Sequence, residues 1–214
     1  MKQLKQPMQQ VFIRYGVRSA VSMRKSHYLF VAMLIWSVLT GLARADEIPV
    51  RYAQLEASDD GGYTLSADFQ LELSERLDNA LSKGVPLHFV FEFICERPRW
   101  YWFNKSAASK KLEAKLSFHA LTRSYRLSIG SNHQTFESAD EALTALGTVR
   151  GWQVLAPGDL EPLSAYTVGV RLSLDINQLP KPFQVSALAN REWTLASNWE
   201  RWGFSTGPNG KMVR

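Results

Sequence analysis

A strict alternation of apolar and polar residues over positions 63–73 constrains the fold of this chain more than any other sequence feature. Its apolar members are Tyr63, Leu65, Ala67, Phe69, Leu71 and Leu73, each separated from the next by one polar residue. Side chains of a β-strand point alternately to opposite faces, so this pattern is typical of a strand with one buried and one solvated face. Gly61-Gly62, just before it, predicts a turn from an earlier strand over 50–57.

The same period recurs along the chain and predicts further strands. We expect them over 87–95, 112–120, 125–129 and 166–174, then from 183 to 187, with a last strand over 193–204. Leu179-Pro180-Lys181-Pro182-Phe183 is predicted to be a stiff, extended connector into the strand at Phe183, because proline fixes φ.

Two short helices are expected between the strands. Ser74 is a suitable N-cap for a helix over 75–83, which Gly84 and Pro86 end. Ser138 and Glu141 have the spacing of a capping box for a second helix, which ends at Gly147. Because strands outnumber helices and do not alternate with them, the sequence predicts a mainly β fold, an antiparallel β-sandwich or open barrel with two short helices.

Residues 1–45 have the three parts of a cleavable signal peptide. A basic segment comes first, then an apolar run of 15 residues from Tyr28 to Leu42, then Ala43-Arg44-Ala45, which matches an A-x-A cleavage site. The run is shorter than the roughly 20 residues that span a bilayer as a helix. We therefore expect cleavage after Ala45, periplasmic localisation, and no transmembrane segment in the exported protein.

The basic character of the chain belongs to this leader. Seven of the 25 basic residues, but none of the 20 acidic ones, precede Asp46, so the remainder has 18 basic and 20 acidic residues and a net charge of −2. A mildly acidic domain has no counterion-release drive toward nucleic acid, which we exclude as a partner. We expect one exported β-rich domain over 46–205 and a flexible tail over 206–214.

Few residues have the pattern of a catalytic or metal site. The one cysteine, Cys95, falls on the apolar face of its strand and is expected to be buried. His88 and His119 are out of phase with the apolar faces of their strands, so they are expected to point to water, and His133 to lie in a turn over 130–133. No histidine pair has a metal-ligand spacing, so no metal, cofactor or catalytic residue is expected.

Gly203–Gly207 matches the G-x-S-x-G pattern of a nucleophile elbow. Such an elbow needs a helix after the serine and a histidine downstream, whereas Pro208 and Gly210 follow here. The match is interpreted as a coincidence.

The segment from Glu96 to Lys105 is the most unusual in the chain. Four consecutive aromatic residues lie among basic ones, a composition that suits stacking and cation–π contacts with a glycan, a lipid headgroup or a protein. The candidate binding residues are Arg97, Arg99, Trp100, Tyr101, Trp102 and Lys105. The alternative is that these rings are core and edge of a continuing strand. Core is also expected for Trp193, Trp199 and Trp202.

Several motifs in one order resemble a known family. They are the run Leu116–Leu127, the segment Arg97–Phe103, the run Leu179–Val185 and the run Trp193–Trp199. Together they are similar to the proteobacterial exported family called domain of unknown function 4390. The resemblance implies a Gram-negative periplasmic protein whose gene often lies beside that of a two-component sensor kinase. It implies no catalytic residues.

Three functions follow from these observations. The first is a non-catalytic binding or interaction module of the cell envelope, with the periplasmic region of a sensor kinase as a possible partner. The second is a carrier of a lipid or hydrophobic ligand, which a deep apolar pocket would favour. The third is an envelope hydrolase, but its most obvious pair, His119 with Glu113, would stand roughly 20 Å apart on one straight strand.

Overall fold

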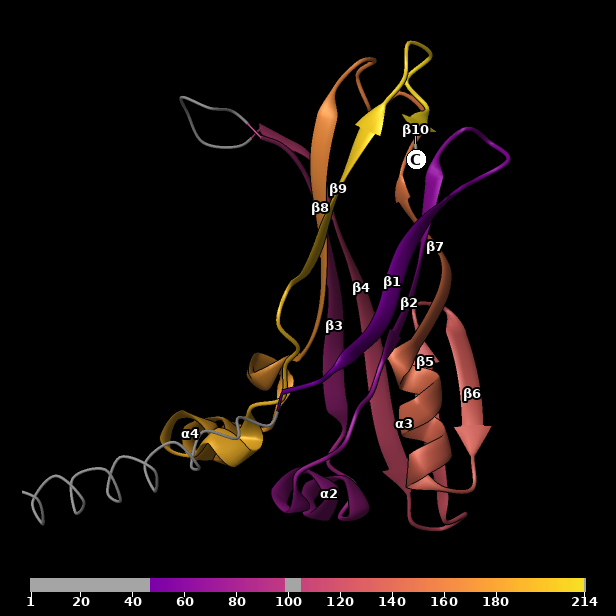
Figure 1. The fold of residues 1–214 in the computed structure, drawn as a ribbon. Helices are drawn as coiled ribbons and strands as arrows, with labels where there is room; N and C mark the ends of the chain where they lie inside the picture. Colours follow the sequence, from indigo (N-terminus) through magenta and orange to yellow (C-terminus); the bar gives the residue numbers. More distant parts are fainter. Residues whose placement is uncertain (1–46, 99–104, 214) are drawn as a thin grey trace, which may run out of the picture. The chain divides into compact units, whose positions relative to one another are not determined.

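The computed structural model describes residues 47–98 and 105–213, and its strands form two sheets (Figure 1). The smaller sheet has the order β1-β2-β7, with β1 at Val50–Ala57, β2 at Tyr63–Phe69 and β7 at Thr148–Leu155. The larger sheet has the order β10-β9-β8-β3-β4-β5-β6. Its strands are β3 (Leu87–Arg97), β4 (Lys105–His119), β5 (Ser124–Ile129), β6 (Asn132–Phe136), β8 (Ala165–Leu174), β9 (Glu200–Thr206) and β10 (Met212–Val213).

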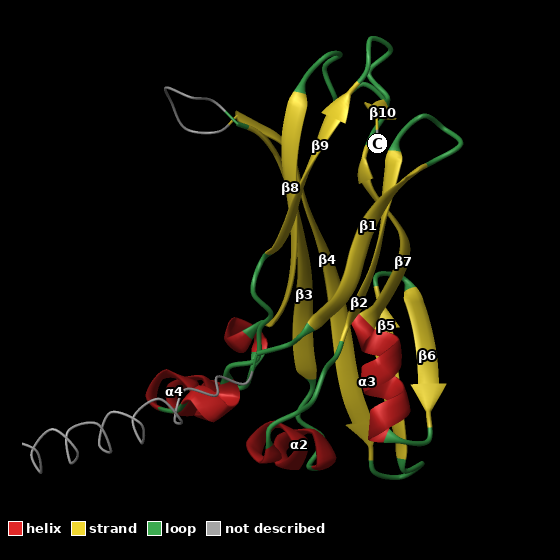
Figure 2. Cartoon of the chain, viewed as in Figure 1, coloured by secondary structure: helices red, strands yellow, loops and turns green. Residues whose placement is uncertain are grey.

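Neighbouring strands in both sheets are antiparallel, and the larger sheet curls toward the smaller one (Figure 2). The predicted mainly β, antiparallel fold is therefore confirmed. None of the helices among the described residues is long and apolar enough to cross a membrane.

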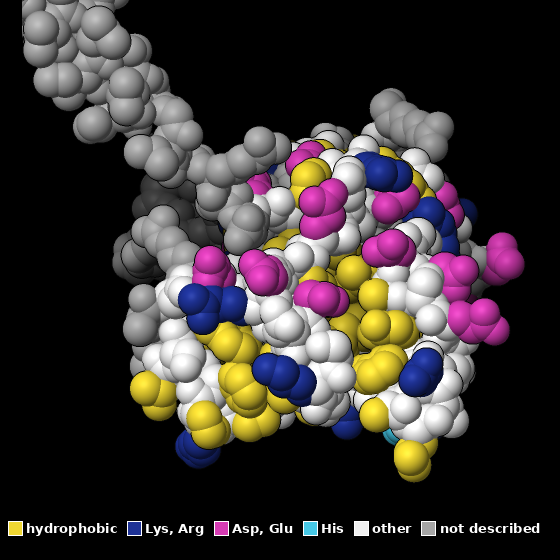
Figure 3. All heavy atoms as spheres, turned by 90° about the horizontal axis from the view of Figure 1, so that it is seen from below, with side chains coloured by type: hydrophobic (Ala, Val, Ile, Leu, Met, Phe, Trp, Pro, Cys, Tyr) yellow, Lys and Arg dark blue, Asp and Glu magenta, His cyan; other side chains and the backbone are white. Residues whose placement is uncertain are grey.

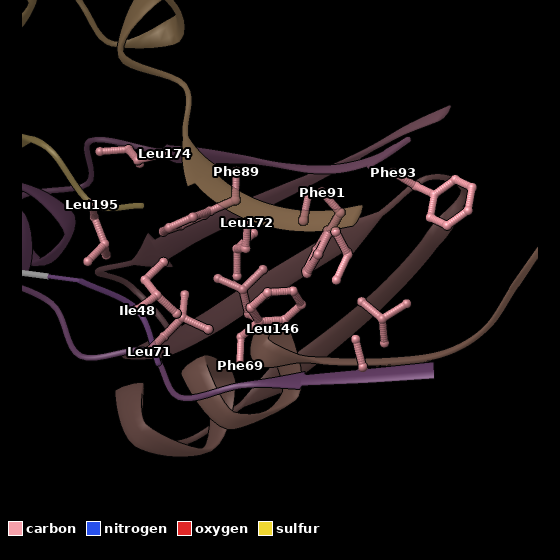
Figure 4. Packing of buried hydrophobic residues seen from close by; sticks show 14 of the residues in the cluster. Ile48, Phe69, Leu71, Phe89, Phe91, Phe93, Leu146, Leu172, Leu174 and Leu195 are labelled. Carbon is pink, nitrogen blue, oxygen red and sulfur yellow. The ribbon is translucent and has the colours of Figure 1, made fainter. Parts of the chain in front are cut away.

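Large apolar side chains fill the space between the sheets. Phe89, Phe91 and Phe93 point inward from β3, the middle strand of the larger sheet, and each is fully buried. The ring of Phe69 on β2 meets that of Phe91 at a centroid distance of 5.7 Å (Figure 4). The apolar residues that alternate in the sequence are thus the ones that form the core, where side chains of both sheets interdigitate.

Both predicted helices are present. Helix α2 (Glu75–Ser82) begins after Ser74, whose hydroxyl accepts a hydrogen bond from the Leu77 N–H. Helix α3 (Ala139–Gly147) begins after Ser138, which accepts one from the Glu141 N–H. These side-chain oxygens satisfy N–H groups that have no partner within the helix.

The strand predicted to start at Phe183 is wrong, because the chain forms helix α4 (Lys181–Ala189) there. Pro180 is its N-cap and Pro182 lies in its first turn, where a missing N–H and a fixed φ suit a helix. The Phe183 ring then packs on Trp193 at a centroid distance of 5.1 Å. Trp193 itself closes a 3₁₀ turn, η2 (Arg191–Trp193). Another 3₁₀ turn, η1 (Ile176–Gln178), follows β8.

The end of the chain also differs from the expected pattern. The last long strand, predicted from Trp193, begins only at Glu200, although Ala196 forms isolated bridges with Glu47 and Ser173. Within the expected tail, Met212–Val213 form β10, which pairs with Thr206 and Ser205. The Met212 N–H donates to the Tyr63 hydroxyl at 2.6 Å and so joins β10 to the smaller sheet.

Candidate functional site

A groove of about 580 Å³ opens between the edge of the smaller sheet and the curled end of the larger one. Its apolar lining comes from four elements: Leu112 (β4), Leu127 and Ile129 (β5), Ala145 (α3), and Val149 and Trp152 (β7). Polar residues Ser131, Asn132, Gln134, Thr148 and Arg150 complete the lining. A concave surface with an apolar base and few polar groups is typical of a ligand site.

Strand β7 forms one wall of the groove and is an edge strand of its sheet, with β2 as its one neighbour in the described residues. Its register with β2 shifts near Arg150 and Gly151, and Gly151 has φ +63°. A glycine at positive φ in such a shift is typical of a β-bulge, which bends a strand and redirects its side chains.

The bulge fixes the position of Arg150 at the rim. Its guanidinium donates to the carbonyl oxygens of Ala67 at 2.9 Å and Val149 at 2.8 Å. It also lies over the ring of Tyr52, 5.0 Å from the centroid. The rim cation is therefore held in place by contacts within the smaller sheet.

Helix α3 forms the second wall because Gly147 lets it lie directly against β2. A Cβ at Gly147 would stand 2.1 Å from the Phe69 carbonyl oxygen. With no side chain there, the last turn of α3 brings Ala145 to the groove, and its small methyl leaves the space open. The predicted helix stop at Gly147 thus has a packing cause as well.

The predicted binding residues are only partly described. Arg99, Trp100, Tyr101 and Trp102 lie outside the described residues, and their role stays a prediction. Arg97 and Lys105 face each other at the ends of β3 and β4. Both form ion pairs with Glu161, the Lys105 Nζ at 3.1 Å. Hydrogen bonding to Lys105 and the nearby positive charges lower the pKa of Glu161.

Cys95 belongs to the core, as predicted. It is fully buried on the inward face of β3, and this burial raises the pKa of its thiol to about 12. Among residues 47–98 and 105–213, no three His, Cys, Asp or Glu side chains come close enough to hold a metal ion. Ser205 of the G-x-S-x-G match lies exposed on β9, with strand β10 after it instead of a helix.

The three histidines among the described residues lie on the outer face of the larger sheet. His119 is exposed, as predicted, whereas His88 is half-buried, and burial together with the charge of Lys115 lowers its pKa. His133 lies on β6, where a turn was predicted, and its Nδ1 is 2.8 Å from the Ser128 hydroxyl.

The three late tryptophans differ in environment. Trp193 is buried, as predicted, and Trp202 is half-buried against the core. Trp199 is half-buried elsewhere, next to Gly169, and the guanidinium groups of Arg171 and Arg201 each make a cation–π contact with its ring. Arg171 also joins Lys111 in ion pairs with Glu92. Burial acts to raise the pKa of Glu92, but hydrogen bonds from these two cations outweigh it and lower that pKa.

Sequence reasoning missed the groove because it missed β6 and β7. Strand β6 has no alternation of apolar residues, and all its residues except Phe136 are exposed. In β7 the bulge at Arg150 and Gly151 interrupts the period, so Val149 and Trp152 do not fall on an alternating pattern. The remaining signal was the isolated Trp152, whose half-exposed ring lines the groove.

Comparison with protein families gives one match. The family model described as Domain of unknown function (DUF4390) matches residues 45–203, which include the strands from β1 to β8, helices α2 to α4 and the start of β9. A search of curated proteins and a search of solved structures found no match.

Proposed function

The chain belongs to the family described as Domain of unknown function (DUF4390). Because resemblance to this family implies an exported protein, we propose that the chain is a periplasmic binding module. In this proposal the exported domain is non-catalytic and holds an extended segment of a partner protein in the groove between β7 and strands β4 to β6. Its partner belongs to the cell envelope.

The leader supports the proposed compartment. It combines a basic start, an apolar run and an A-x-A sequence, with no acidic residue before Asp46. Cleavage after Ala45 would release residues 46–214, which is the compact unit Ala45–Arg214 without its first residue. Blocking signal peptidase should then leave a longer, membrane-bound precursor, whereas an unchanged size would contradict cleavage.

The observation that best supports peptide binding is that the groove combines an apolar base with the free edge of strand β7. An extended peptide placed beside β7 would form main-chain hydrogen bonds with that edge, and alternate side chains would enter the groove. Leu112 and Ile129 are half-buried and supply apolar contact for those side chains. The polar residues of the rim, such as Asn132 and Gln134, are available to hydrogen-bond the solvent side of the peptide.

The filled core favours recognition at this surface over enclosure of a ligand. Phe89, Phe91 and Phe93 occupy the space between the sheets and are fully buried (Figure 4). A carrier would use the same groove for an acyl chain, since its base is apolar. A crosslink from the groove distinguishes these two occupants directly.

We would therefore place a photo-crosslinking amino acid at Gln134, on the rim, and separately at Leu163, which is 76% exposed and does not line the groove. Irradiation of living cells should join position 134, but not position 163, to one envelope protein. A peptide of the crosslinked segment should then bind the purified unit Ala45–Arg214 in calorimetry. Ile129→Glu should weaken that binding about thirtyfold, as for an interface hot spot, and Leu163→Glu should not.

Three outcomes would contradict the proposal. They are adducts with lipid alone, equal protein adducts at both positions, and unchanged peptide affinity in a folded Ile129→Glu variant. Thermal melting of both variants verifies that they are folded. The periplasmic region of a sensor kinase is the first partner to test by calorimetry, because the family resemblance points to it. Absence of binding there would remove that partner but not the groove.

A further inference from the structure

A shallow hollow of about 530 Å³ lies on the outer face of the larger sheet, near the turn between β4 and β5. Four basic side chains line it: Lys115 and His119 from β4, Arg126 from β5 and His133 from β6. Ser117 and Ser128 contribute hydroxyl groups. Cations and hydroxyls together offer hydrogen-bond donors to the oxygens of a phosphate group.

The strand register brings these residues together. Lys115 lies opposite Ser128, which lies opposite His133, and Ser117 lies opposite Arg126. Directly opposed side chains on one face stand about 5 Å apart, so residues distant in sequence form one cluster. Buried Leu116 and Leu127 alternate with them on the inner face, which fixes their outward direction.

The charge of the hollow is not neutralised within the described part of the chain. None of the ion pairs there involves Lys115 or Arg126. Glu113 lies two residues from Lys115 on the same outer face of β4, and Glu137 follows β6, but neither lines the hollow. Its lining therefore attracts anions.

An apolar residue beside the hollow is fully exposed to solvent. Leu121, in the turn 120–123 between β4 and β5, is 102% exposed, and His119 and Arg126 connect that turn to the hollow. The turn lies at the end of the molecule with α2, where Figure 3 shows exposed hydrophobic side chains with Lys and Arg side chains beside them, and Asp and Glu side chains elsewhere on the same face. Apolar side chains next to cations are typical of surfaces that bind anionic membranes.

We propose that the hollow and Leu121 together dock the protein on a membrane rich in anionic phospholipid. The lipid phosphodiester binds Lys115 and Arg126, and Leu121 enters the boundary between headgroups and acyl chains. This surface faces away from the groove-lining side of β4 and β5, because the two sets of residues alternate along those strands. The inference does not rest on the proposed function.

Vesicle sedimentation tests the proposal with the purified unit Ala45–Arg214. The unit should bind vesicles of phosphatidylcholine mixed with phosphatidylglycerol, and not vesicles of phosphatidylcholine alone. The double variant Lys115→Glu, Arg126→Glu should bind the mixed vesicles at least about tenfold more weakly. Its control, Lys110→Glu with Lys211→Glu, has the same net charge at two exposed positions outside the hollow. The control should bind as the unchanged protein does.

Two further measurements distinguish binding of a lipid membrane from binding of a soluble anion. Leu121→Ser should also weaken binding to mixed vesicles, because the apolar contact is lost. Glycerol 1-phosphate at the same phosphate concentration should not compete. Binding to both kinds of vesicle alike, equal loss in the two double variants, or full competition by glycerol 1-phosphate would each overturn the proposal.

Discussion

At the scale of single residues, burial determines which side chains can react with or bind another molecule. Cys95 carries a nucleophilic atom, but β3 places it among phenylalanines in the core, where the thiolate is disfavoured. Lys115 and Arg126 have the opposite environment, since they are exposed and without ion pairs in the described structure. Of these residues, only Lys115 and Arg126 are available to a ligand.

The burial of Cys95 predicts a thiol that is inert in the folded protein. At pH 8 almost none of it is thiolate, because its pKa is about 12, and reagents cannot reach it. A colorimetric thiol reagent should therefore react only after denaturant is added. Ser205→Cys, on exposed β9, is the control and should react at once in the folded state. Equally fast reaction of Cys95 in native buffer would show that the core opens readily.

At the scale of elements, the sequence predicts well where one face of an element is buried. The starts of β2, β3 and α2 agree with the expected positions, because alternation or an N-cap marks each of them. Predictions from the sequence are wrong where the apolar spacing fits two kinds of element and another feature determines which one forms. Phe183 and Ala187 fit a strand period and a helix spacing alike, and Pro180 with Pro182 settled the choice for α4.

The candidate site was less predictable than the fold. Lys115 and Arg126 meet only through the β4–β5 register, and the groove needs β7, whose bulge removes the alternating pattern. The spacing of residues in the sequence predicts neither the cluster of Lys115 with Arg126 nor the groove beside β7, because both depend on which strands become neighbours. The predicted aromatic segment is mostly outside the described residues, so its contribution stays a prediction.

The junction of α3 with β2 predicts an intolerant glycine. Gly147→Ala would place a Cβ 2.1 Å from the Phe69 carbonyl oxygen, so the helix must move away from the sheet. We expect a loss of about 3 kcal/mol in the free energy of unfolding, measured by urea titration. Gly203→Ala is the control, since its nearest neighbour would be 3.6 Å away. A Gly147→Ala protein as stable as the control would contradict this packing.

At the scale of the whole molecule, protection should fall from the middle of the larger sheet to its edge. Strand β3 has β4 and β8 on its two sides and an inner face that is fully buried, whereas β6 has β5 alone and is mostly exposed. Hydrogen exchange should thus be slowest in β3 and β8 and fastest in β6. Equal protection in β6 and β3 would indicate a partner that covers the β6 edge.

The pairing of β3 with β8 also sets when the molecule can fold. Phe93 needs Val170 as its neighbour, and the chain between them forms β4 to β7. A nascent chain therefore cannot complete this sheet until most of its length has been synthesised, because its central strand waits for a late partner. For the export proposed above, this delay means that the native sheet cannot close before most of the chain has been made, so a still unfolded chain is available to a translocation channel.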